Sequence, residues 1–201
     1  MITHVFFDVG GVLGTSGWGT EPRALAVERF GLDAADFDRR HREVVGPWEE
    51  GHMTLGEYLD CTVFDAPRSF TRDEFKAFMW AQSRPKLDTI AIARALAAAG
   101  RYRLMTINNE SAELNAYRLT LFGLTPIFSA FFSSCWLGVA KPSRRMYELA
   151  LAMSQAQPGQ AVFIDDREQN LAPARSLGMQ AIRFTTAEEL RRNLASLGVA
   201  T

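Results

Sequence analysis

Short apolar runs alternate with longer helical stretches along the second half of the chain. Five runs end in polar or glycine-rich residues, as buried strands do: 3–7, 102–105, 130–132, 161–164 and 180–184. The helices predicted around the later runs open with proline or stop at glycine: 87–99, 111–122, 142–152 and 170–177. This alternation predicts an α/β fold, a mostly parallel sheet with helices on both faces.

The stretch 15–83 breaks this rhythm because it contains no convincing strand pattern. It is predicted to form helices at 21–30, 34–45, 54–63 and 71–82. It is too long for a crossover connection and too rich in aromatic residues for a disordered loop. We therefore expect two domains, a core formed by 1–14 and 84–201 and a small helical domain, 15–83, inserted after the first strand. Arg84-Pro85 is the expected return linker.

Composition narrows the class of protein. The chain has 201 residues, 47% of them hydrophobic, and its 22 basic residues nearly balance 23 acidic ones. Such a balance argues against a nucleic-acid partner, and no stretch approaches the ~20 apolar residues of a membrane span. Two cysteines, Cys61 and Cys135, are too few for a disulfide framework, and the first residues do not resemble a signal peptide. We expect a cytoplasmic protein; the pattern gives no oligomeric state.

Asp8 ends the first apolar run and is followed by Gly10 and Gly11. Glycines let the backbone turn sharply and come close to a ligand. Ligands of doubly wound sheets bind beyond the carboxyl ends of the strands, so an Asp there can be a nucleophile or a metal ligand. A lone Asp after a strand is at least as typical of a turn or helix cap.

Asp165 and Asp166 form an acidic pair directly after the run 161–164. Adjacent carboxylates repel each other unless a cation or hydrogen-bond donors offset their charge. Mg²⁺ prefers oxygen ligands, commonly carboxylates together with phosphate oxygens. The pair therefore predicts a cation site; the alternative is that Asp166 simply caps the next helix.

Lys141 and Thr106 are two further candidates. Lys141 precedes a helix predicted to open with proline, where its ammonium can neutralise carboxylates and hold a phosphate. Thr106 follows the run 102–105, where its hydroxyl can donate to a phosphate oxygen. Each residue alone is typical of a surface or a turn. Together with Asp8 and the acidic pair, they occur in an order that converges at one edge of a parallel sheet.

The combined pattern resembles a known family. The order Asp8-x-Gly10-Gly-Val12, Thr106, Lys141-Pro142 and Asp165-Asp166-x-x-x-Asn170 is similar to the four motifs of the haloacid dehalogenase-like (HAD) superfamily. Residues 134–142 and 163–179 most resemble the branch that contains the N-terminal phosphatase domain of soluble epoxide hydrolases and a bacterial glucose-1-phosphate phosphatase. The resemblance implies a Rossmann-like core and a helical cap.

The resemblance also implies a reaction. It implies a Mg²⁺-dependent phosphatase for a small phosphorylated metabolite, with a sugar phosphate favoured, in which Asp8 attacks phosphorus and forms an aspartyl-phosphate. The implied metal ligands are Asp8, the carbonyl of Gly10, Asp166 and Asp165. The implied phosphate-binding groups are Thr106, Ile107, Asn108 and Lys141, and Asn170 would orient the acidic pair.

Two positions depart from the family pattern. Related phosphatases usually carry a second Asp, the general acid–base, where this chain has Gly10, and general acid–base catalysis is worth roughly 10²–10⁴-fold in rate. Its loss favours substrates with good leaving groups, unless a cap residue such as His52 substitutes. Relatives also often place Asn directly after the Thr, where this chain has Ile107.

Two rival interpretations stay open. A haloacid dehalogenase also uses an equivalent Asp and lacks the second one, but it needs no metal, and the pair Asp165-Asp166 would then be hard to explain. A catalytically weakened HAD-fold binding protein agrees with Gly10 and Ile107.

Overall fold

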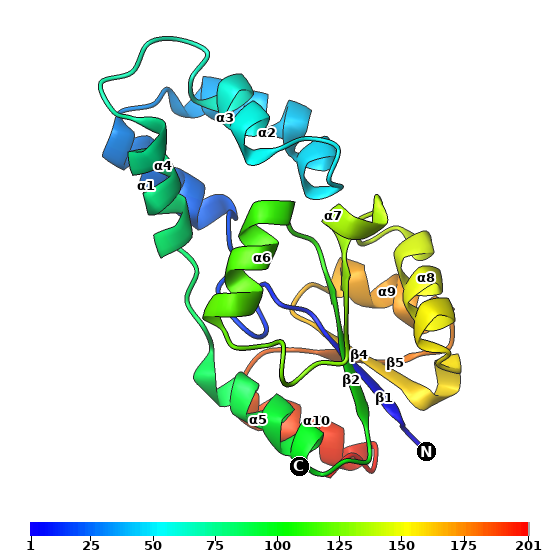
Figure 1. Cartoon of the computed structure of the whole chain (residues 1–201). Coiled ribbons are helices and arrows are strands. Elements are labelled where there is room, and N and C mark those ends of the chain that lie inside the picture. Colours follow the sequence, from blue (N-terminus) through cyan, green and yellow to red (C-terminus); the bar gives the residue numbers. More distant parts are fainter. Residues whose placement is uncertain (201) are drawn as a thin grey trace.

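A computed structural model, which describes residues 1–200, contains one parallel sheet in that range (Figure 1). Its strand order is β3-β2-β1-β4-β5. The bounds are β1 His4–Phe7, β2 Arg103–Asn108, β3 Ala130–Ser133, β4 Ala161–Asp165 and β5 Gln180–Arg183. The predicted fold class is confirmed: every predicted strand is present, and β1, which carries Asp8 at its end, lies in the centre. No helix in residues 1–200 has the length and apolar character needed to cross a bilayer.

Helices cover both faces of this sheet. The bounds are α5 Leu87–Ala98, α6 Ala112–Leu121, α8 Arg144–Ser154, α9 Glu168–Ser176 and α10 Ala187–Ser196, with the short α7 Ser134–Leu137 and the 3₁₀ turn η1 Pro158–Gln160 between them. Successive side chains of a strand point to opposite faces. Accordingly Phe7 packs in the apolar core beside α5 and α10, whereas Phe6 packs in the core beside α8 and α9.

Three details differ from the predicted pattern of this core. Helix α10 was not predicted, although Thr186 caps its first turn and Leu190 and Leu194 form a buried stripe on one face. Helix α8 begins at Arg144, so Pro142 precedes the helix instead of opening it. Strand β2 extends three residues beyond the predicted 102–105, because Ile107 and Asn108 pair with β3.

The stretch between β1 and α5 folds into α1 Thr20–Phe30, α2 Ala34–Glu49, α3 Leu55–Thr62 and α4 Arg72–Ala81. These helices have an aromatic core of their own, in which the Trp48 ring stacks on Tyr58 with centroids 3.9 Å apart. The Tyr58 hydroxyl accepts from Trp18 Nε1 at 2.8 Å. We call this helical unit the cap and its face toward the sheet the cap side; the exact division at 14/15 and 83/84 stays a prediction.

Helix α2 is longer than its sequence pattern indicates. Gly46 and Pro47 predict an end at residue 45, yet the helix continues to Glu49 with Pro47 inside it. Proline normally weakens a helix interior because it lacks an N–H donor and crowds the preceding turn. The following residue, Trp48, is 1% exposed and stacked on Tyr58, so tertiary packing stabilises this last turn. The extension carries Glu49 to the edge of the sheet.

The cap contacts the core at the linkers, at the end of α2 and along α6, where Leu55 N donates to Glu113 Oε1 at 2.8 Å. At the linkers, Thr15 N donates to Arg84 O at 2.9 Å and Lys86 N donates to Leu13 O at 2.8 Å. At the far end of α2, Ser134 Oγ donates to Glu49 O at 2.6 Å. The cap is therefore positioned above the carboxyl ends of the strands (Figure 1).

Candidate active site

Asp8, Lys141 and Asp165 form the centre of the candidate site. In the parallel register Phe7 lies opposite Ile164, so Asp8 and Asp165 leave neighbouring strand ends side by side. The Lys141 ammonium lies between them, 2.8 Å from Asp8 Oδ1 and 2.7 Å from Asp165 Oδ2. All three side chains are buried. A charge-assisted contact of this kind in a low-dielectric setting holds both carboxylates in place.

Asp165 is saturated with hydrogen bonds. Besides Lys141, it accepts from Arg167 N at 2.8 Å and from Asn170 Nδ2, which is 3.1 Å from each carboxylate oxygen. Tyr147 donates to the backbone oxygen of Asn170 at 2.6 Å and so anchors the start of α9. The geometry makes Asp165 a residue that orients Lys141 and the acidic pair.

Asp166, unlike Asp165, lacks a full set of hydrogen-bond donors in the described part of the chain. Its buried Oδ1 has no hydrogen-bond partner within residues 1–200. Oxygens of Asp8, Asp165 and Asp166 lie within 4.8 Å of one another. Burial, and next the charge of Asp165, raise the pKa of the Asp166 carboxyl. A buried carboxylate oxygen without a donor, within a group of three carboxylates, fits a hard divalent cation such as Mg²⁺.

Burial also raises the pKa of Asp8 to about 7, against the opposing effect of Lys141 and with a further contribution from Asp165. Three carboxylates share one ammonium here, so the site carries an excess of negative charge. A bound cation would offset that excess and favour the ionised, nucleophilic form of Asp8.

Gly11 shapes the place of Asp166. Its φ is +80°, and a Cβ added there would lie 2.3 Å from Asp166 Oδ2. Gly11→Ala is therefore expected to displace the Asp166 carboxylate and weaken Mg²⁺ binding by about 10–100-fold, measured by titration calorimetry. Gly31→Ala is the matched control, since Gly31 has a φ of +61° with open space around it. Equal metal affinity in the two variants would contradict the role assigned to Gly11.

The side chains at the end of β2 are not arranged as the sequence pattern predicts. Thr106 is fully buried with its hydroxyl 3.5 Å from Asn108 Oδ1. Asn108 in turn donates to Asn115 at 3.0 Å and accepts from Ser133 at 3.0 Å. Neither residue lines the cavity described below, because β2 continues beyond Thr106. The phosphate-binding roles predicted for Thr106, Ile107 and Asn108 stay predictions.

Asn109 directly follows the predicted phosphate-binding residues, and its side chain reaches the cavity. It clamps the backbone of Lys141, with Oδ1 accepting from Lys141 N and Nδ2 donating to Lys141 O, both at 2.8 Å. Its side chain also lines the cavity beside Asp8. The adjacent residues Asn108 and Asn109 indicate in the sequence that an amide side chain lies near the site. Only the length of β2 shows that this residue is Asn109.

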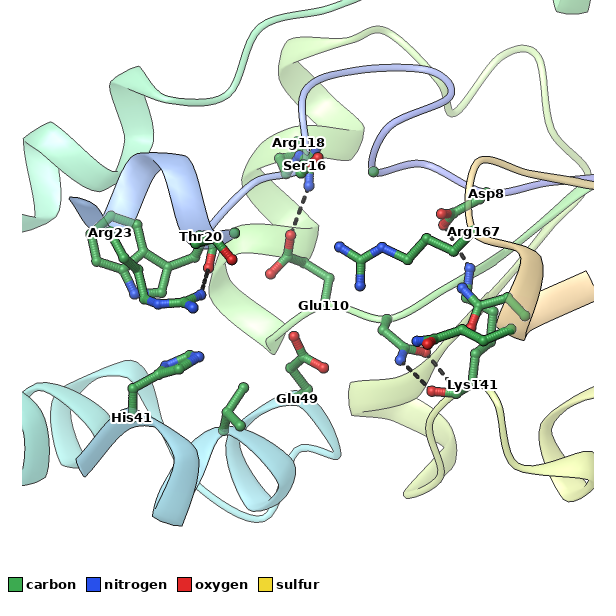
Figure 2. Close-up of a pocket in the computed structure, with 17 residues that line it drawn as sticks. Asp8, Ser16, Thr20, Arg23, His41, Glu49, Glu110, Arg118, Lys141 and Arg167 are labelled. Atoms are coloured by element: carbon green, nitrogen blue, oxygen red, sulfur yellow. Dashed lines mark hydrogen bonds and ion pairs between the residues drawn. The ribbon is translucent and has the colours of Figure 1, made fainter. Parts of the chain in front are cut away.

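A cavity of about 320 Å³ lies between the cap and the strand ends. Asp8, Gly10, Lys141 and Asn170 line it from the core (Figure 2). Residues that the sequence did not single out complete its wall: Arg23, His41, Glu49, Glu110, Arg118 and Arg167. They lie on helices α1, α2 and α6 and in loops far apart in sequence, so no local motif signals them.

Glu110 and Arg118 form a buried ion pair in this wall. Arg118 Nη1 donates to Glu110 Oε2 at 2.7 Å, and a second guanidinium nitrogen donates to Thr15 O at the cap linker. Glu110 Oε1 accepts from Ser111 N at 3.1 Å. The pair therefore joins the start of α6 to the linker that leads into the cap.

The two cap histidines are placed differently. His52, considered as a substitute acid–base, is exposed and does not line the cavity. His41 does line it, but its Nδ1 is 2.9 Å from the Tyr58 hydroxyl, and burial lowers its pKa to about 4. His41 is thus a neutral hydrogen-bonding group at neutral pH.

Comparison with known proteins agrees with this geometry. The chain is 26% identical over 206 residues to bifunctional epoxide hydrolase 2 of Sus scrofa, covering 94% of this chain but only 37% of that protein. It is 23% identical to D-ribitol-5-phosphate phosphatase of Bacteroides thetaiotaomicron, covering 96% and 97% of the two chains. A magnesium complex of a HAD family enzyme from the same organism superposes with a TM-score of 0.81 at 16% identity, covering 96% and 98%.

The likeness to that solved structure shows the fold, and a family model gives the classification. The model of the haloacid dehalogenase-like hydrolases matches residues 2–178, which include Asp8, Lys141 and both aspartates after β4. The predicted resemblance is confirmed, and the chain belongs to the haloacid dehalogenase-like hydrolase family.

Proposed function

We propose that this protein is a Mg²⁺-dependent phosphomonoester hydrolase that forms an aspartyl-phosphate on Asp8. The observation that carries the proposal is the pairing of Asp8 with Lys141 in the wall of a polar cavity, with an unpartnered Asp166 oxygen in the same group of three carboxylates. The names of two relatives, an epoxide hydrolase described as bifunctional and a ribitol-phosphate phosphatase, are consistent with this activity.

In this mechanism Asp8 attacks the phosphorus of the bound ester and the bond to the leaving oxygen breaks. Lys141, held by Asp165 and by the backbone clamp of Asn109, neutralises the charge that gathers between Asp8 and the phosphoryl oxygens. Water then attacks the aspartyl-phosphate, which releases inorganic phosphate and restores Asp8. The cap, proposed as residues 15–83, excludes bulk water and contacts the leaving group.

Asp8, Asp166 and the backbone carbonyl of Gly10 would hold the Mg²⁺ ion, with Asp165 supporting them through Lys141 and Asn170. The bound ion supplies charge neutralisation, so that a carboxylate can approach an anionic phosphate.

A small polyol or sugar phosphate is the favoured substrate. The cavity wall is mostly polar and includes Ser16, Thr20, Arg23 and Asn109. Hydroxyl and guanidinium groups suit a ligand rich in hydroxyls, and the volume of about 320 Å³ suits a small metabolite. The proposed partners therefore are small phosphorylated molecules and not macromolecules.

Metal dependence tests the proposal. Phosphate release from a panel of sugar, polyol and aryl phosphates should require Mg²⁺ and disappear on chelation. Asp166→Asn should lower activity by at least about 100-fold and raise the Mg²⁺ concentration needed. Asp88→Asn, at an exposed carboxylate of α5, is the control and should retain full activity.

The two rivals predict other outcomes of the same assay. A dehalogenase would release halide from 2-haloacids in the presence of chelator and would tolerate Asp166→Asn. A binding protein without catalysis, the alternative that Gly10 favours, would release no phosphate from any member of the panel.

A further inference from the structure

The proposed reaction lacks its usual proton-transfer group at Gly10, and the surroundings of Gly10 show that space is not the reason. A Cβ added there would meet Ser16 Cα at 3.8 Å and Arg118 Nη1 at 3.9 Å, which are ordinary contacts. The backbone environment therefore does not exclude a side chain at this position. The wall of the same cavity contains two other carboxylates, Glu110 and Glu49.

Glu49 lies at the end of α2 in the cap, and hydrogen bonds to the core fix the position of its backbone. Ser134 Oγ donates to Glu49 O at 2.6 Å and accepts from Glu110 N at 3.0 Å, so one hydroxyl fixes the backbones of both glutamates. Gly51 approaches the core so closely that a Cβ there would lie 2.1 Å from Cys135 O. The last turn of α2 is therefore docked tightly on the core. Figure 2 shows the Glu49 side chain projecting from the cap side toward Glu110, into the same space as the Arg167 guanidinium.

Glu110 and His41, two other titratable residues of the cavity wall, already have hydrogen-bond partners within the protein. Glu110 is bound by Arg118 at 2.7 Å and by Ser111 N, so both of its carboxylate oxygens already have donors, although burial raises its pKa against the opposing effect of Arg118. His41 is engaged with Tyr58. Among residues 1–200 no donor lies in hydrogen-bond reach of the Glu49 carboxylate oxygens, which leaves this group free to exchange a proton with a ligand.

The charged groups around Glu49 come from every element that faces it. Glu110 precedes α6, Arg167 precedes α9, Lys141 precedes α8, and Arg23 lies on α1. Burial, followed by the charge of Glu110, raises the pKa of Glu49 to about 7, against the opposing effect of the three cations. A carboxyl group with a pKa near the working pH can both donate and accept a proton.

We propose that Glu49 is the general acid–base of the reaction at Asp8, in the role that Gly10 cannot fill. This inference rests on the proposed phosphatase function. In the first step a carboxylate oxygen of Asp8 bonds to phosphorus, the ester P–O bond breaks, and the leaving oxygen takes the electron pair and the proton of neutral Glu49. The products of this step are the free alcohol, the aspartyl-phosphate and the Glu49 carboxylate.

In the second step the Glu49 carboxylate accepts a proton from water as the water oxygen bonds to phosphorus. The Asp8–phosphorus bond breaks, its electron pair returns to the Asp8 carboxylate, and inorganic phosphate leaves. Glu49 is neutral again, and the cycle consumes one water. Because Glu49 belongs to the cap, the site is complete only when the cap is docked on the core through Ser134.

The test is Glu49→Gln, which keeps the shape of the side chain and removes its ability to exchange a proton. An alkyl phosphate, ribitol 5-phosphate or glycerol 3-phosphate, needs its leaving oxygen protonated, so its turnover should fall by about 10²–10⁴-fold. With p-nitrophenyl phosphate the leaving group needs no proton, so the burst of nitrophenol should change less than about threefold. The aspartyl-phosphate should then accumulate and be detected after acid quench.

The pH profile gives a second readout. The neutral form of Glu49 donates the proton, so kcat/KM for the alkyl ester should fall as pH rises through about 7. This decrease should be absent from Glu49→Gln, because glutamine does not titrate. The titration of the substrate is common to both proteins when the same ester is used, so a difference between their pH profiles comes from residue 49. Glu43→Gln, at an exposed position of α2 paired with Arg39, is the matched control and should behave as wild type.

Two results would overturn the assignment of Glu49. One is an equal loss of the aryl burst and of alkyl turnover in Glu49→Gln, which indicates a general disturbance of the site. The other is unchanged turnover of both esters. A wild-type protein without phosphate release from any ester would instead remove the proposed function itself, and the Glu49 assignment with it.

Discussion

Asp8→Asn is expected to lower phosphate release by at least about 10⁴-fold, because an amide oxygen cannot form the acyl-phosphate bond. The substitution keeps the local structure, since an Asn oxygen can still accept from Val9 N and from the Lys141 ammonium, now 2.7 and 2.8 Å from Asp8 Oδ1. Initial rates with p-nitrophenyl phosphate, and trapping of the wild-type nucleophile with beryllofluoride, measure the effect. Residual activity within about tenfold of wild type would exclude Asp8 as the nucleophile.

The same variant has a defined effect on stability in the metal-free protein. Burial raises the pKa of Asp8 from its usual range to about 7, so the folded state binds more protons than the unfolded state between these values. Stability of wild type should therefore decrease as pH rises from about 4 through about 7. Asp8→Asn lacks this titration and should be the more stable protein at pH 8. Urea unfolding in the presence of chelator measures the difference.

Lys141→Met is expected to reduce the free energy of unfolding by about 3–5 kcal/mol, because it leaves buried carboxylates without a counter-charge. The ammonium contacts both Asp8 and Asp165, and its own side chain is 2% exposed. Lys141 lowers the pKa of Asp8 against the effect of burial, so without the ammonium the Asp8 carboxyl favours the protonated form more strongly. Protonation of Asp8 relieves part of the penalty, so the deficit relative to wild type should be smallest at low pH and grow as pH rises.

Two comparisons separate this effect from a simple loss of packing. Lys76→Met, at a half-buried position of α4 without an ion pair among residues 1–200, should change stability by less than about 0.5 kcal/mol. The double variant Lys141→Met/Asp8→Asn should recover part of the loss, because one of the two orphaned charges is gone. If the double variant is as unstable as the sum of the single changes, the ion pair does not account for the role of Lys141.

Most of the core could be predicted from the sequence because its signals are local. Apolar runs such as 161–164 and the glycines that stop helices mark strand and helix positions without knowledge of the rest of the fold. A mostly parallel sheet then follows from the alternation of strands and helices, whereas the strand order is known only from the structure. Asp8 and Asp165 could be placed at the same edge of the sheet for this reason, as residues that end parallel strands.

The side chains around the substrate cavity could not be predicted in this way. Asn109 rather than Thr106 lines the cavity with Asp8 because β2 continues to Asn108, and that length is set by its pairing with β3. Glu49 reaches the cavity because Trp48 packs on Tyr58 and prolongs α2 past Pro47. In both cases contacts with residues far along the chain override the local signal.

The sequence by itself determined the class of fold, the family and the residues that sit at the strand ends, because each depends on short-range patterns of apolar, glycine and acidic residues. Only the tertiary structure decided how these residues differ in state: Asp165 is saturated by Lys141 and Asn170, whereas Asp166 keeps an unpartnered oxygen. It also decided which cap residues line the cavity together with Gly10. Burial and the identity of a neighbour arise from packing between distant segments, and these are what set the charge and proton affinity of a carboxylate.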